Sequence, residues 1–181
     1  ILSFNLQQGK DGFQLYDEIK HRRLQSFNTG YIFISAETDP SLVHSVIELQ
    51  PDEFLAKPYS IGQLQQRIER VLKRKQALRQ VYNLLDAGQL DKALAQIEQQ
   101  LTDSPPPKVV PALLRLKGDL LLQLNQAPAA VDFYKSVQTV QNFSWAQIGL
   151  VRALYQSKRF DQLGMMLEAM ANALIQGDRI E

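Results

Sequence analysis

Two sequence patterns meet near residue 75, and this division limits most strongly the folds that the chain can adopt. Before it, short apolar runs rich in β-branched and aromatic residues (31–35 and 53–56) alternate with segments of helical periodicity. This alternation is typical of strand–helix–strand units in a parallel sheet. After it, Gly and Pro separate helical patterns, and no strand pattern occurs. We therefore predict two domains, 1–74 of α/β class and 75–181 of all-α class.

Patterns within 1–74 predict where its strands and helices begin. Ile1-Leu2 has the pattern of a strand end, and 31–35 is apolar almost throughout, as expected when helices cover both faces of a parallel sheet. Ser60 and Gln63 form a capping-box pattern at the start of a helix. The chain begins inside an apolar segment and without Met, so we expect it to be a piece of a longer protein.

The second domain contains an internal repeat. Residues 88–93 align with 125–130 at an offset of 37, which three extra residues near Pro105 to Pro107 reduce to about 34. A third copy opens at 145–149 with Trp-Ala-Gln-Ile-Gly. This pattern resembles tetratricopeptide repeats, which open with Trp-x-x-Leu-Gly, and the resemblance implies an all-α solenoid. The expected helix pairs are about 75–107, 111–143 and 144–175.

Residue size predicts how the paired helices pack. Small residues are expected where helices approach most closely, and bulky residues are expected to fill the space between them. The small ones are Gly118, Ala130 and Gly149, and the bulky ones are Leu84, Ile97, Leu121, Tyr134 and Leu167.

Two polar residues lie where open α/β sheets place their sites. Ser35 ends one apolar run and Lys57 follows the next, so both are expected at carboxyl ends of strands. A hydroxyl and an ammonium at that edge can bind one anion together. Pro58 directly after Lys57 can hold a tight turn, in a trans or a cis peptide bond, that directs the amine inward.

With these residues in register, 1–74 resembles a response-regulator receiver domain. The implied fold is the C-terminal half of a flavodoxin-like α/β domain, with its last three strands, each followed by a helix. The resemblance implies that Ser35 is the switch hydroxyl and Lys57 the phosphoryl-binding lysine. It also assigns Phe54 to the aromatic that rotates inward on activation, and it assigns Pro58, Asp11 and Gly12 to structural turns.

The resemblance fails at the phosphoacceptor. Counting back from Asp11-Gly12 places the acceptor at Ser3, and a neutral hydroxyl cannot form the acyl phosphate of the family. The family's acidic pair is absent from this chain, so we expect no metal site within it. Mg²⁺ is expected only if the full-length protein can be phosphorylated. The alternative is a phosphorylation-competent switch whose acceptor Asp this register misplaces.

Composition argues against several classes of function. Twenty Lys and Arg oppose nineteen Asp and Glu, and this balance does not favour nucleic acid or anionic membranes as partners. No apolar run approaches the ~20 residues that span a bilayer. The chain contains no Cys, which permits a reducing cytoplasm. We find no nucleophile elbow, Gly-rich phosphate loop or metal-ligand cluster, so a fragment of an α/β enzyme is disfavoured.

The sequence therefore predicts a cytoplasmic two-component response regulator that is not an enzyme. Its degenerate phosphoacceptor domain is expected to act by docking, and its repeats to bind a partner protein in their groove. A histidine kinase is a further expected partner if the phosphoacceptor is competent. A homodimer through 42–49 and 64–72 is also expected. Lys73-Arg74-Lys75 is interpreted as a solvated helix face.

Overall fold

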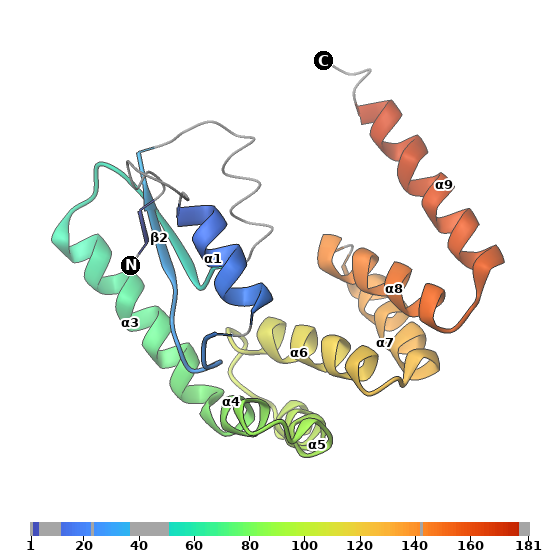
Figure 1. Cartoon of the computed structure of the whole chain (residues 1–181), viewed down its shortest axis with the longest axis horizontal. Coiled ribbons are helices and arrows are strands. Elements are labelled where there is room, and N and C mark those ends of the chain that lie inside the picture. The colour runs from blue at the N-terminus through green and yellow to red at the C-terminus, as the bar shows by residue number, and fades with distance from the viewer. Residues whose placement is uncertain (1, 4–11, 23, 37–50, 142, 178–181) are drawn as a thin grey trace. The chain divides into compact units, whose positions relative to one another are not determined.

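The computed structural model describes residues 2–3, 12–22, 24–36, 51–141 and 143–177 (Figure 1). Helices take up 70% of the described residues. The chain divides into two compact units, unit 1 (Ile1–Gln89) and unit 2 (Leu90–Glu181). This division falls later in the chain than the boundary predicted after residue 74.

Unit 1 contains a small parallel sheet in the order β1 (Leu2–Ser3), β2 (Ile32–Ser35) and β3 (Glu53–Ala56). Leu2 pairs with Phe33, and Ile32 pairs with Glu53. Helix α1 (Gly12–His21) lies between β1 and β2 in the chain, and α3 (Ile61–Ala77) follows β3. The strand pattern at 31–35 and 53–56 therefore predicted both of the longer strands.

Helices cover both faces of β2. Ile32 and Ile34 form a core with Leu55 of β3 and Val71 of α3. Phe33, between them, is fully buried on the other face, where its ring lies 5.3 Å from that of Tyr16 in α1. Successive side chains of a strand point to opposite faces, so an uninterrupted apolar run is needed here. The prediction of a strand buried on both faces is confirmed.

The predicted start of α3 is also confirmed. The Ser60 hydroxyl accepts a hydrogen bond from the Gln63 amide, and the Gln63 side chain accepts one from the Ser60 amide. This reciprocal pair satisfies two amide groups that the helix itself leaves without partners.

The prediction of a flavodoxin-like receiver half is wrong. In the described residues the sheet has three strands of two to four residues, and no doubly wound alternation of strands and helices is evident. The α/β unit also does not end with helix α3, contrary to the prediction. The hydrogen bonds of α3 continue through Leu78 into α4 (Arg79–Asp86), which belongs to unit 1, because no Gly or Pro interrupts the chain before Gly88.

Acidic residues at the start of β3 hold α3 in place. Asp52 accepts hydrogen bonds from the Tyr31 amide at 2.8 Å and from Arg74 at 3.0 Å, and it pairs with Lys75 at 3.2 Å. Glu53 pairs with two further arginines of α3, Arg67 and Arg70. The interpretation of Arg74 and Lys75 as a solvated face is therefore wrong, since both are partly buried ion-pair partners.

Asp86, at the end of α4, holds the segment that precedes β2. Its carboxylate accepts hydrogen bonds from the Ser26 hydroxyl, from the Phe27 amide at 2.8 Å and from the Asn28 side chain. The Phe27 ring stacks on that of Tyr82, with centroids 6.2 Å apart. These contacts tie α4 to the sheet of unit 1.

Unit 2 contains five described helices, and successive helices contact one another. Pro111 and Pro128 lie in the first turns of their helices, where the missing amide costs no hydrogen bond. The helices are α5 (Leu90–Thr102), α6 (Val110–Gln123), α7 (Ala127–Val140), α8 (Ser144–Gln156) and α9 (Phe160–Gly177).

One type of turn ends α4, α6 and α8. Gly88, Asn125 and Lys158 have φ values of 68°, 58° and 57°, in the left-handed region. In each turn, the next residue's amide bonds to the carbonyl five residues earlier, as Gln126 does to Leu121 at 2.8 Å. This is the Schellman arrangement, which satisfies the last carbonyls of a helix. The turns recur at the spacing that the sequence alignment predicts.

Packing in unit 2 agrees with most of the predicted core. Ile97, Leu121 and Tyr134 are buried, and the Tyr134 ring lies against the backbones of Gly118 and Gly149. Leu167 was expected to be buried but is 46% exposed. It lies on α9, which has no buried residue among its described side chains and carries all three methionines of the chain, Met165, Met166 and Met170.

Candidate functional site

The sheet of unit 1 brings three predicted site residues to one edge. Ser35 ends β2 level with Ala56, and Lys57 follows directly. The Lys57 amide donates a hydrogen bond to the Ser35 carbonyl at 2.7 Å. Ser3 lies level with Ile34, one residue before Ser35. Since the strands are parallel, all three residues lie at their carboxyl ends.

The side chains at this edge differ in exposure. Ser35 is buried, with 4% of its surface exposed, whereas Lys57 is exposed. Phe54 is half-buried in β3, and the Lys57–Pro58 bond is cis. Gly12 begins α1, and Asp11 lies outside the described residues. The backbone therefore brings Ser3, Ser35 and Lys57 to one edge of the sheet.

Only part of the homodimer face predicted in unit 1 is exposed among the described residues. Leu64 and Ile68 pack against the core that contains Val71, while Leu72 is 61% exposed. The other predicted part, 42–49, lies outside the described residues.

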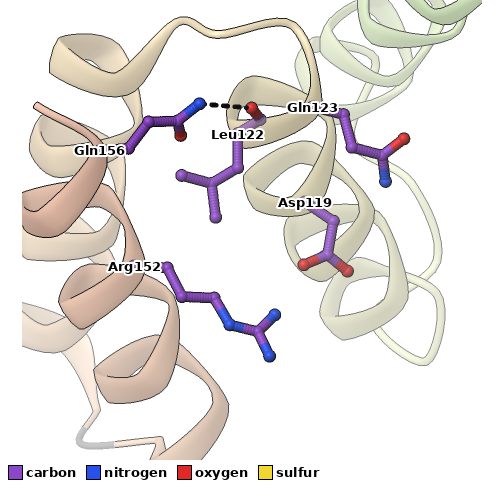
Figure 2. Close-up of a pocket in the computed structure, with 5 residues that line it drawn as sticks. All are labelled: Asp119, Leu122, Gln123, Arg152 and Gln156. Atoms are coloured by element: carbon purple, nitrogen blue, oxygen red, sulfur yellow. Dashed lines mark hydrogen bonds between the residues drawn. The ribbon is translucent and has the colours of Figure 1, made fainter.

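Unit 2 has a hollow between α6 and α8, which sequence reasoning did not identify. Figure 2 shows Arg152 and Gln156 of α8 facing Asp119 and Leu122 of α6 across it. Gln123 of α6 also lines the hollow, and its side chain extends away from α8. We name these five residues the α6–α8 hollow, and its volume is about 290 Å³. Gln156 closes one end, since its side-chain amide donates hydrogen bonds to the Leu122 carbonyl and, at 2.7 Å, to Asn125.

The charges around the hollow are close enough to influence one another. Arg152 is exposed, and no ion pair of its guanidinium is found in the described part of the chain. Burial lowers the pKa of Arg115, an effect that Asp119 opposes. Arg115 also lies over the ring of Trp145, 5.8 Å from its centroid. The hollow thus combines an apolar floor at Leu122 with the exposed guanidinium of Arg152 and the carboxylate of Asp119.

The sequence could locate one wall of the hollow, α8, but not the helix that faces it. The Trp-x-x-x-Gly opening located α8, and Arg152 and Gln156 follow Gly149 at helical spacing. However, periodicity cannot show which other helix these side chains face. That pairing depends on tertiary contacts between α6 and α8.

No group of three His, Cys, Asp or Glu side chains that could hold a metal ion occurs among the described residues. Within the same residues, no helix has both the length and the apolar character needed to cross a membrane. Comparisons of the chain with protein-family models, with curated proteins and with solved structures find no match.

Proposed function

We propose that this chain is a cytoplasmic regulatory protein of two-component signal transduction that binds a partner protein through unit 2. The proposal assigns it no catalytic activity. One observation carries the binding part: the α6–α8 hollow places the exposed Arg152 beside the apolar Leu122 and two side-chain amides. This mixture can fix the position of one protein segment by charge, by hydrogen bonds and by apolar contact.

The size of the hollow supports a peptide rather than a cofactor as its ligand. A volume of about 290 Å³ lies just below the roughly 300–1,000 Å³ typical of small-molecule sites. Room for one or two side chains suits a partner segment that lies along the helices and inserts an anchor.

Peptide display against the full chain tests the binding proposal. Random peptides would be selected on the wild-type chain, and their affinities measured by calorimetry for the wild type, Arg152→Glu and Lys158→Glu. Lys158 is a matched control, because it is an exposed cation of unit 2 outside the hollow.

We expect Arg152→Glu to weaken binding about tenfold or more, the effect of losing one well-placed charged contact. Lys158→Glu should change affinity little. Peptides that bind Arg152→Glu as tightly as the wild type would refute this use of the hollow.

The signalling part of the proposal is supported by the sheet edge of unit 1. The backbones of Ser3, Ser35 and Lys57 lie at the carboxyl ends of these parallel strands, and the acceptor position of the proposed register is a serine in the sequence. In the proposal, signalling proceeds by assembly with a partner and not by phosphorylation of this chain, since a serine cannot form an acyl phosphate.

Incubation of the full-length protein with Mg²⁺ and acetyl phosphate, followed by intact mass measurement, tests this part. We expect no phosphoryl adduct. An adduct that hydroxylamine removes would reveal an acceptor Asp and favour the alternative, a phosphorylation-competent switch that uses Mg²⁺ and a histidine kinase.

A further inference from the structure

We infer that Tyr134 is the positioning residue of the α6–α8 hollow: its ring, held between Gly118 and Gly149, sets the separation of Asp119 and Leu122 from Arg152 and Gln156. The inference rests on the proposed function, because it concerns the same hollow. It adds a residue of α7 that does not itself line the hollow.

The ring of Tyr134 touches the backbones of both helices. A Cβ atom at Gly118 would lie 2.5 Å from the Tyr134 hydroxyl oxygen, and one at Gly149 would lie 2.2 Å from the ring carbon that bears this hydroxyl. Both distances are far shorter than a van der Waals contact, so only glycine fits at either position. Tyr134 is 1% exposed. The ring therefore separates the backbones of α6 and α8 at this level.

The hollow lies one helical turn from the ring in the same gap. Leu122 follows Gly118 by four residues, and Arg152 follows Gly149 by three. Residues three and four apart lie above one another on a helix surface. The ring and the hollow therefore occupy successive levels between α6 and α8, and a change in the spacing at the ring should be passed to the hollow.

The hydroxyl end of Tyr134 also lies within reach of the charges of the hollow. Burial raises the pKa of Tyr134, Asp119 raises it further, and Arg152 and Arg115 oppose the rise. These charges act on the hydroxyl, whereas the spacing of α6 and α8 depends on the ring, which Tyr134→Phe keeps.

Three variants distinguish a role of Tyr134 in positioning the walls of the hollow from a general contribution to core stability. Tyr134→Phe keeps the ring, whereas Tyr134→Leu removes it. Leu113→Ala is the matched control, since Leu113 is fully buried on α6 but lies outside the stripe that contains Gly118 and Leu122. All three would be studied as full chains under conditions where urea titration shows them to be folded.

The first measurement needs no ligand. The Nε–H signal of Arg152 in proton–nitrogen NMR spectra reports the surroundings of its guanidinium. We expect it to shift in Tyr134→Leu and to stay near its wild-type position in Tyr134→Phe and Leu113→Ala. An unchanged Arg152 signal in Tyr134→Leu, or an equal shift in Leu113→Ala, would overturn the inference.

The second measurement uses the display-selected peptide that binds the wild-type chain most tightly. We expect its Kd to rise at least tenfold for Tyr134→Leu and less than threefold for Tyr134→Phe and Leu113→Ala. If no peptide binds the wild type, the proposed function fails, while the Arg152 signal still decides whether Tyr134 positions the hollow.

Discussion

Gly88, Asn125 and Lys158 show how single residues end the helices of this chain. All three adopt positive φ values, which glycine reaches without steric cost and Asn at a small one. Lysine is the least suited of the three, because its Cβ approaches the following carbonyl and it lacks the short polar side chain with which Asn can hydrogen-bond locally. Nothing lies within 4 Å of a Cβ built at Gly88, so a substitution there tests backbone conformation alone.

Opposite substitutions at two of these turns should have opposite effects on stability. Gly88→Ala should lower the free energy of unfolding by about 1 kcal/mol, because a Cβ disfavours the left-handed region. Lys158→Gly should raise it by about 0.5–1 kcal/mol. Urea unfolding of each variant against the wild type measures both changes. A stabilised Gly88→Ala would contradict this account of the turns.

Tyr82 should make unit 1 less stable as the pH rises through the alkaline range. Burial, with a smaller contribution from Asp52, raises the pKa of Tyr82 from 10.0 to about 12 in the folded chain. Between these values the unfolded chain loses the phenolic proton while the folded chain keeps it. The folded state then binds more protons, so the free energy of unfolding falls as pH rises.

Comparison of wild type with Tyr82→Phe isolates this effect. The wild type should lose on the order of 2 kcal/mol more stability than the variant between pH 10 and pH 12. Urea titrations at several pH values measure the difference. Parallel losses in both proteins would mean that Tyr82 keeps its ordinary pKa when folded.

At the scale of elements, α4 is the helix whose surroundings differ most from expectation. Its apolar residues Val81, Tyr82 and Leu85 are buried. Leu84, which was predicted to fill the space between paired helices, is only partly buried. The helical pattern does not reveal which core the buried residues enter, and the repeat alignment assigned α4 to the helical domain. The decisive contacts come instead from Asp86, a polar residue that binds the 26–28 segment of unit 1.

Removal of the Asp86 carboxylate should release the segment before β2. Asp86→Ala removes the acceptor of the Phe27 amide and of two side-chain donors. These bonds are exposed and water can replace the carboxylate, so we expect a loss of about 0.5–1.5 kcal/mol. Hydrogen exchange at the Phe27 amide should become faster. Asp132→Ala, on an exposed face of α7, serves as a control and should leave that exchange unchanged. Unaltered protection of Phe27 in Asp86→Ala would rule out this role.

For the whole molecule, the sequence predicted the helices better than the sheet domain. Helical pairs in unit 2 were located because Gly88, Asn125 and the 158–161 segment mark turns that local chemistry requires. The receiver-like fold was wrong because short strand patterns do not determine how many strands and helices assemble around them. The α6–α8 hollow could not be predicted, since Asp119 and Arg152 come to line one hollow only through the tertiary packing of α6 and α8.

Two compact units should respond separately to a destabilised core. Leu113→Ala removes most of a fully buried side chain from unit 2 and should cost about 2–5 kcal/mol there. The fluorescence of Trp145, the only tryptophan, should report an earlier unfolding midpoint in urea. Hydrogen exchange of the β2 amides in unit 1 should stay at the wild-type rate. Faster exchange in β2 would show that the two units unfold together.

Helix α9 gives the chain a simple redox chemistry. The chain has no cysteine, and its three methionines all lie on this one helix, with Met165 63% exposed. Thioether sulfur is oxidised to a polar sulfoxide, which methionine sulfoxide reductases can reverse. Peroxide should therefore add oxygen to sulfur only along α9, and the cores built around Phe33 and Tyr134 should keep their covalent structure.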